Sequence, residues 1–110
     1  MIHLLRQPAT DPQLQEMLEA HGEYMKVAVD VRRGVLAGGG EFHADCESVL
    51  LEDGSLKDDI WGADWVPGPR LVRCSALINI RPRINPAMDI HDSAIREQVE
   101  RVTRKLLERS

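Results

Sequence analysis

The side chains best suited to chemistry lie together in residues 38–47, Gly-Gly-Gly-Glu-Phe-His-Ala-Asp-Cys-Glu. They include carboxylate, imidazole and thiol groups, which most often bind a metal ion or transfer a proton in proteins. Alternate side chains of a β-strand point to the same face. If residues 42–51 continue as a strand, one face of the segment therefore carries a row of four titratable groups. These groups are Glu41, His43, Asp45 and Glu47.

This row of side chains is compatible with two kinds of chemistry. The carboxylates of Glu41 and Asp45, together with the imidazole of His43, could hold a divalent metal ion, although one histidine is few for zinc. Alternatively, His43 acts as a general base that Asp45 or Glu41 orients, while an arginine binds an anionic substrate. The ordinary alternative is a solvent-exposed sheet face on which these acids pair with arginines of a neighbouring strand.

The arginines for either arrangement are expected from residues 71–80, which alternate between polar and apolar side chains as a strand does. Arg73 falls on the polar face of that strand, and Arg81 follows its end. We expect both arginines to lie opposite the acidic row. Arg73, Arg81 and Glu47 are therefore candidates for the lining of a polar binding patch.

The three consecutive glycines, Gly38, Gly39 and Gly40, weaken a strand by roughly 0.5–1 kcal/mol each relative to alanine. Glycine inside a strand is typical of a bulge, or of a site where another backbone or a ligand comes close. No Gly-Lys-Ser/Thr follows, so the segment is not a phosphate-binding P-loop. We expect a bulge or a close approach here, and we count the glycines as candidate binding residues.

The position of the thiol depends on whether residues 42–51 form a strand or a helix. A strand places Cys46 on the face opposite His43, which argues against a Cys–His nucleophile pair. A helix would instead align His43 with Cys46 or Glu47, three or four residues further on. Val49-Leu50-Leu51 and the following Asp-Gly turn favour the strand. We expect Cys46 and Cys74 to be small buried hydrophobic side chains with free thiols.

Residues 56–69 are expected to form an irregular loop, which Pro67, Gly68 and Pro69 close. The loop holds two tryptophans, Trp61 and Trp65, which predict a small lid folded over the core. The alternative is a rim that packs on a ligand or on a second subunit. That alternative requires exposed indoles that form an apolar patch.

The remaining segments predict the fold. Strands are expected at residues 2–5, 24–31 and from 35 into the glycines, in addition to residues 42–51 and 71–80. A capped helix begins near Thr10, and a second helix runs from Asp92 or Ser93 to about residue 108. The order is β-α-β-β-β-β-α. It predicts a single α+β domain, residues 1–110, in two layers: a mainly antiparallel sheet of four or five strands covered by two helices.

Composition limits the class of partner and the compartment. The 110 residues carry 14 basic and 18 acidic side chains, a formal net charge of −4, and four aromatic residues in total. This charge disfavours nucleic acid or an anionic membrane as a partner. No window approaches the roughly 18 apolar residues of a membrane span, and the first residues do not resemble a signal peptide. We therefore expect a cytoplasmic protein, with a homodimer as its anticipated assembly.

Several of these motifs resemble a family of short bacterial and archaeal proteins that is classed as a domain of unknown function. The resemblance spans nearly the whole chain. It is carried by Gly38-Gly39-Gly40 with His43-Ala44-Asp45-Cys46-Glu47, by Leu51-Glu52-Asp53-Gly54-Ser55, by Trp61-Gly62-Ala63 and by Ile78-Asn79-Ile80-Arg81-Pro82. It implies an independent cytosolic domain and brings no assigned activity and no catalytic residues.

Three functions are consistent with the sequence. The first is a binding or regulatory module with an anion- or metal-accepting patch around His43. The second is a small acid–base or hydrolase-like enzyme that uses His43 with Asp45 or Glu41. The third is a protein-interaction module that acts through Trp61 and Trp65. An enzyme requires His43 in a concave pocket, hydrogen-bonded to one carboxylate and open at its other nitrogen.

Overall fold

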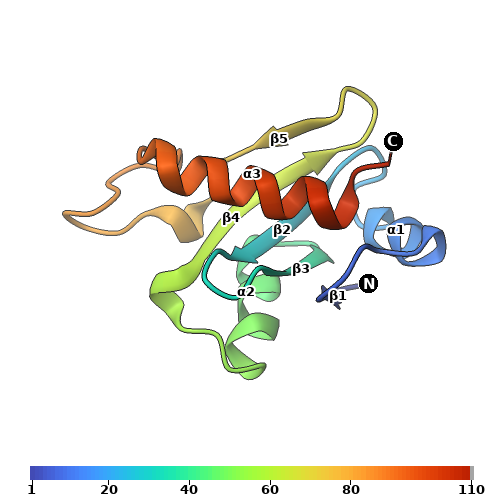
Figure 1. Ribbon diagram of the computed structural model, residues 1–110, viewed down its shortest axis with the longest axis horizontal. Helices are drawn as coiled ribbons and strands as arrows, with labels where there is room; N and C mark the ends of the chain where they lie inside the picture. Colours follow the sequence, from blue (N-terminus) through green and yellow to red (C-terminus); the bar gives the residue numbers. More distant parts are fainter. Residues whose placement is uncertain (110) are drawn as a thin grey trace.

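The computed structural model describes residues 1–109 and consists of a five-stranded antiparallel sheet with helices on both faces (Figure 1). The strand order is β1-β3-β2-β4-β5. The strands are β1 (His3–Leu5), β2 (Met25–Asp30), β3 (Val35–Gly40), β4 (Ile60–Val66) and β5 (Leu71–Arg73). The helices are α1 (Asp11–Leu18), α2 (His43–Glu52) and α3 (Ser93–Leu107), with the short 3-10 helices η1 (Lys57–Asp59) and η2 (Leu77–Asn79). The predicted α+β class with a mainly antiparallel sheet is confirmed.

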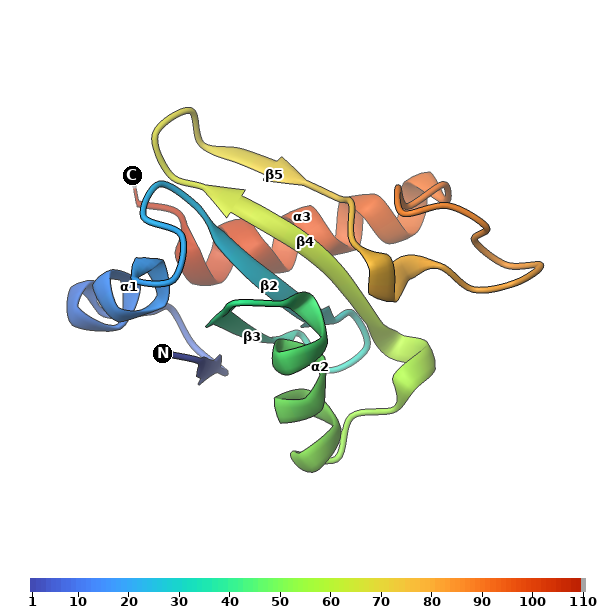
Figure 2. The same cartoon turned by 180° about the vertical axis from the view of Figure 1, so that it is seen from behind.

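The two faces of the sheet bury separate groups of apolar side chains. One face packs Val27 and Val29 of β2 against α1 and α3, and α3 crosses this face in Figure 1. The other face packs Ala28 of β2 against Cys46 and Leu50 of α2, and Figure 2 shows α2 on this side. We call the second side the α2 face. The fold therefore has three layers instead of the expected two, because residues 43–52 provide an additional helix.

The predicted helix starts are confirmed. At α1, the Thr10 hydroxyl accepts a hydrogen bond from the backbone N–H of Gln13 at 3.3 Å. In return, the Gln13 side chain accepts from the N–H of Thr10 at 2.9 Å, which completes a capping box. At α3, Asp92 accepts from the backbone N–H of Ala94 at 2.8 Å. Both caps satisfy N–H groups that a helix otherwise leaves without partners.

The expected strand at residues 42–51 is wrong, because the segment forms helix α2. Cys46 and Leu50 are fully buried at a spacing of four, which is the helical repeat. His43 and Glu47 share the inward side of the same helix. Because Glu47 is one of only three buried residues of α2 and the inward-facing His43 is also polar, the apolar period of 3.6 is hidden in the sequence. Gly54, with φ +100°, follows the end of the helix.

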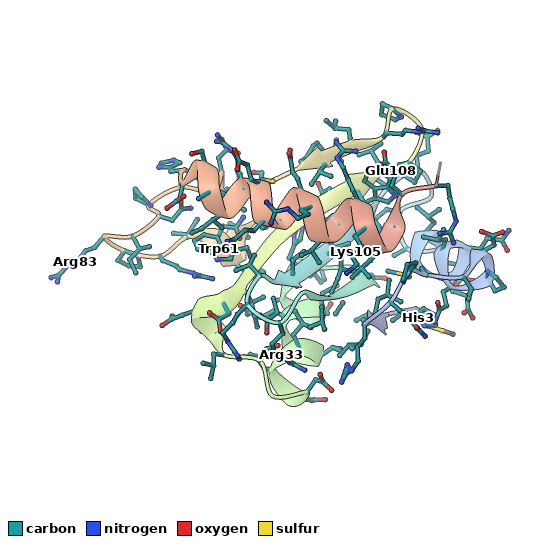
Figure 3. The ribbon with its side chains drawn as sticks, viewed as in Figure 1. His3, Arg33, Trp61, Arg83, Lys105 and Glu108 are labelled. Carbon is teal, nitrogen blue, oxygen red and sulfur yellow. The ribbon has the colours of Figure 1, made fainter. Side chains whose placement is uncertain are left out.

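The expected irregular loop at residues 56–69 is also wrong, because it contains strand β4, which lies between β2 and β5. Trp61, Ala63 and Trp65 alternate into the core on the side of α1 and α3. The two tryptophans are 3% and 2% exposed, and Figure 3 shows Trp61 inside the body of the molecule beside α3. The interaction-module hypothesis requires exposed indoles, and neither indole is exposed.

The expected long strand at residues 71–80 is shorter than predicted, since β5 ends at Arg73. The chain then crosses the α2 face of β4. Asn79, which is fully buried, accepts a hydrogen bond from the N–H of Gly62 at 2.7 Å and donates one to its carbonyl at 2.9 Å. A Cβ atom on Gly62 would lie 2.6 Å from the Cβ of Ala76. Gly62 therefore permits this close crossing. Beyond η2 the chain extends outward, with Arg83 at the tip (Figure 3).

The three glycines form the expected bulge and the expected close approach. Lys26 pairs with Gly40 and Val27 pairs with Gly38, so Gly39 is the additional residue of β3. Gly39 has φ +102°, and a Cβ atom there would lie 2.2 Å from the carbonyl oxygen of Met1. The groups that come close are thus the chain's own N-terminus and helix α1. Close packing within the chain accounts for both glycines without a ligand, because side chains of Val27 and Met17 crowd Gly38 and the backbone of Met1 and Met17 crowds Gly39.

We expect Gly39→Ala to lower the free energy of unfolding more than Gly54→Ala does. Both glycines have nearly the same positive φ, so the conformational strain of about 1–3 kcal/mol is common to both substitutions. A Cβ atom at Gly39 also overlaps with neighbouring atoms, which costs about 1–3 kcal/mol more. No atom lies within 4 Å of a Cβ atom at Gly54. Urea unfolding of both variants measures the difference. Equal losses would show that the backbone approach at Gly39 is not tight.

Candidate functional site

A groove with a volume of about 470 Å³ opens on the α2 face of the sheet. It lies between the first residues of α2 and the segment that follows β5. Its lining residues are Tyr24, Lys26, Phe42, His43, Ala44, Asp64, Ser75, Ala76, Leu77, Ile78 and Met88. We call it the His43 groove. Its size is within the range of pockets that bind small molecules.

Strand register places three charged residues in one row at this groove. Lys26 of β2 is the cross-strand partner of Asp64 of β4, and Asp64 is the partner of Arg73 of β5. Cross-strand partners point to the same face of a sheet. The row therefore runs across three neighbouring strands on the α2 face, with a carboxylate between two cations.

His43, the first residue of α2, hydrogen-bonds to Asp64, the middle residue of this row. Its Nε2 lies 2.9 Å from Oδ1 of Asp64 and 2.9 Å from the carbonyl oxygen of Ala63. Both partners are acceptors, so Nε2 must carry a proton and donate to them. In the neutral imidazole, Nδ1 is then the nitrogen with the free lone pair. No side chain or backbone group of residues 1–109 hydrogen-bonds to Nδ1.

Both carboxylate oxygens of Asp64 have a partner in the chain. Oδ1 accepts from His43, and Oδ2 lies 3.3 Å from the guanidinium of Arg73. The Arg73 guanidinium in turn lies 5.1 Å from the centre of the Tyr24 ring. Tyr24 stacks on His21 with ring centres 4.8 Å apart. The side chains of His43 and Asp64 are 12% and 15% exposed, so water screens their contact less than it would a surface pair.

The groove is also bordered by the amino end of α2. No side chain of residues 1–109 caps this helix at Phe42, so the N–H groups of His43 and Ala44 have no capping side chain. These groups carry the partial positive charge of a helix start. Asp45 lies in the first turn, which is a favourable position for an acidic residue, but its side chain is exposed and it does not line the groove.

The structure gives His43 a different carboxylate partner from those expected. Helical geometry from residue 43 onward removes the shared face on which Glu41, His43 and Asp45 were placed. Glu41 and Asp45 are both exposed, and the structure pairs neither of them with His43. The carbonyl oxygen of Glu41 instead accepts a hydrogen bond from His21 at 3.2 Å. The partner of His43 is Asp64.

The residues expected to hold a metal ion are not brought together in the structure. No group of three or more His, Cys, Asp and Glu side chains within residues 1–109 is placed to hold a metal ion. The expected donor set of Glu41, His43 and Asp45 is thus not assembled, and the His43 groove itself offers one imidazole and one carboxylate. Structural and catalytic zinc sites use three or four protein ligands.

Apart from His43, none of the residues predicted to bind a ligand is in the lining of the groove, and Arg81 and Glu47 make contacts elsewhere. The Arg81 guanidinium stacks 3.8 Å above the Trp61 ring and donates to the carbonyl oxygens of Asp58 at 3.0 Å and of Ile60. Burial lowers the pKa of Arg81. Glu47 is buried, with one oxygen 3.8 Å from the Lys57 ammonium, and its Oε2 has no hydrogen-bond partner within residues 1–109. Arg73, by contrast, adjoins the groove through Asp64.

Several residues of the site were not predicted, although one signal in the sequence could have located them. Trp61, Ala63 and Trp65 alternate as a half-buried strand does. Read in this way, the pattern places Asp64 on the opposite face of the sheet. The same alternation in β2 places Lys26 on that face, beside Asp64. The Gly and Pro residues around this segment favoured a loop and concealed the strand.

Comparisons with known proteins place the chain in a family without assigning it an activity. A family model described as Protein of unknown function (DUF5674) matches residues 3–106. The comparison with curated proteins found no match, and neither did the comparison with solved structures. No helix within residues 1–109 combines the length and the apolar character needed to cross a membrane.

Asn79 supports one wall of the groove, and we expect Asn79→Ala to cost about 2–4 kcal/mol of stability. The substitution leaves the N–H and carbonyl of Gly62 without their partners in a buried position, and it also removes a bond to the carbonyl of Met88 at 3.1 Å. Ser48→Ala, on an exposed position of α2, is the control and should change stability by less than about 0.5 kcal/mol. Chemical denaturation measures both, and similar losses would contradict the supporting role of Asn79.

Both cysteines are free thiols, and burial raises the pKa of each to about 11. Because the thiolate is the reactive form, alkylation of the folded protein at about pH 8 should be about 100-fold slower than that of the unfolded chain. The folded rate should keep rising with pH toward about 11, whereas the unfolded rate should level off near 9. Iodoacetamide labelling with and without urea measures this. Equal rates would show that the thiols are accessible and ordinary.

Proposed function

We propose that this chain, which belongs to the family described as Protein of unknown function (DUF5674), is a small acid–base enzyme whose catalytic base is His43 and whose orienting carboxylate is Asp64. The substrate would bind in the His43 groove. The single observation that carries the proposal is the pair of hydrogen bonds from Nε2 of His43 to Asp64 and Ala63. They define which nitrogen is protonated and leave Nδ1 free for proton transfer.

This arrangement supports a general-base role for His43. The base must lie in a concave site, be oriented by a hydrogen bond and keep its other nitrogen within reach of the proton to be removed. His43 lines the groove, and Asp64 accepts from Nε2. Asp64 would also stabilise the imidazolium that forms when Nδ1 takes up a proton. Arg73 holds the second oxygen of Asp64, which restricts its rotation.

Hydrolysis is the reaction that these groups support. Nδ1 of His43 takes a proton from a water molecule as the water oxygen bonds to the electrophilic atom of an ester or related group. The N–H groups at the start of α2 would stabilise the negative charge that develops on the substrate oxygen. The proton on Nδ1 then passes to the leaving oxygen as its bond to the substrate breaks. One water molecule is consumed, and two products leave.

A binding module without turnover is the second candidate. The observation that favours it is that no hydroxyl or thiol of residues 1–109 hydrogen-bonds to His43, so a nucleophile of the chain is not aligned with the base. Ser75 lines the groove without such a bond. In this case the same groove would hold a ligand, and His43 would serve as a hydrogen-bond acceptor. Product formation distinguishes the two candidates.

We expect His43→Gln and Asp64→Asn each to lower kcat/KM for para-nitrophenyl ester hydrolysis by about 100-fold or more. His43→Gln removes the base, and Asp64→Asn removes the charge that fixes its tautomer. His91→Gln is the matched control, because His91 is exposed and does not line the groove. Release of para-nitrophenol by the purified proteins gives the rates, and thermal unfolding verifies that each variant is folded.

Two results would overturn the enzyme proposal. The first is an absence of turnover above the His43→Gln background for para-nitrophenyl acetate, octanoate and phosphate. The second is an Asp64→Asn variant that hydrolyses the best of these probes at the wild-type rate. A wild-type rate in His91→Gln together with loss in both groove variants supports the proposal.

A further inference from the structure

We infer that the ligand of the His43 groove is an organic anion with an apolar body, whose carboxylate or phosphate group binds beside Lys26. This inference rests on the groove being the binding site, as proposed above, and it names the class of substrate. The contacts of Lys26 indicate that the ligand carries a negative charge. The exposed apolar side chains around the groove indicate that the ligand also has an apolar part.

Lys26 is a cation without an anionic partner in the groove. Its register partner on β4 is Asp64, but the oxygens of Asp64 are bound by His43 and Arg73. Within residues 1–109 no carboxylate oxygen lies within 4 Å of the Lys26 ammonium, which instead lies 5.6 Å from the centre of the Phe42 ring. Lys26 is a partly buried residue, and an incoming anion would give its ammonium a charge-assisted hydrogen bond.

The charges around the groove favour a negative ligand. Asp64 is the sole carboxylate of the lining within the described chain, and two donors already bind it. Lys26 and Arg73 flank it with two positive charges. The uncapped start of α2 adds partial charge of the same sign at Phe42–Ala44. The whole chain carries a formal charge of −4, so this positive region is local and does not reflect the overall composition.

Apolar side chains gather around the same groove. Phe42 is 61% exposed, Leu77 is 72% exposed and Met88 is 45% exposed, and all three line it. Large apolar side chains that are exposed together around one cavity indicate a binding surface. An inorganic anion would leave this surface in contact with water. A neutral apolar molecule would leave Lys26 unpaired, so a ligand that combines both parts fits best.

A titration with matched probes, followed by NMR chemical shifts of the wild-type protein, tests the inference. Octanoate and octyl phosphate carry an anion and an apolar chain, octanamide carries the chain alone, and acetate carries the anion alone. We expect both amphiphilic anions to bind at least about tenfold more tightly than octanamide or acetate. The shift changes should include Lys26, Phe42 and Leu77. The comparison of octanoate with octyl phosphate identifies the preferred head group.

Lys26→Gln separates the charge from the apolar contacts. We expect it to weaken octanoate binding by about tenfold or more while octanamide binding is unchanged. Lys57→Gln is the control, because Lys57 is exposed and lies outside the groove. Equal affinity of octanoate and octanamide for the wild type, or no effect of Lys26→Gln on octanoate, would overturn the inference. So would octanoate shifts confined to residues outside the groove.

The binding titration tests the ligand class separately from the proposed catalytic activity. Octanoate binding that requires Lys26, in a protein that does not hydrolyse the esters, would support the ligand class and overturn the enzyme proposal. Ester hydrolysis that requires His43, in a protein that does not distinguish octanoate from octanamide, would do the reverse. The two proposals can therefore fail separately.

Discussion

The carboxylate of Asp64 joins three elements of the fold. It belongs to β4, it accepts a hydrogen bond from His43 at the start of α2, and it forms an ion pair with Arg73 of β5. Because β4 lies between β2 and β5, these contacts align α2 with the row of charges on the sheet. The groove exists where this alignment leaves space between α2 and residues 75–78. The proposed role of His43 as an oriented base depends on Asp64 holding it in this position.

Close backbone packing makes this geometry possible. Gly39 lets the N-terminus and α1 approach β3, and Gly62 lets the chain after β5 cross β4. Larger side chains at either position would separate these layers. Two of the three glycines that look like a ligand-binding loop in the sequence are therefore explained by the protein's own packing, Gly38 against side chains and Gly39 against backbone. The candidate functional residue is therefore His43, which follows these glycines in the sequence.

The sequence predicted those parts of the fold that local chemistry determines. The capping box at Thr10, the cap at Asp92 and the alternation of β2 each depend on neighbouring residues, and each was found. Helix α2 was missed because Glu47 is buried and His43 faces inward, at positions that usually hold apolar residues. Strand β4 was missed because glycine and proline flank an alternating pattern. His43 was identified as the central residue, but its partner Asp64 is 21 residues away and becomes a neighbour only through the packing of α2 on β4.

The protonation of the His43 ring is the property on which the proposed chemistry depends. Long-range proton–nitrogen NMR correlation spectra of the four histidines report which ring nitrogen carries the proton in the neutral form. The structure predicts a proton on Nε2 of His43 and none on Nδ1 in the wild type, and a loss of this preference in Asp64→Ala. A proton on Nδ1, or a mixture of tautomers like that of a solvated histidine, would contradict the hydrogen bond from His43 to Asp64 and the role of His43 as an oriented base.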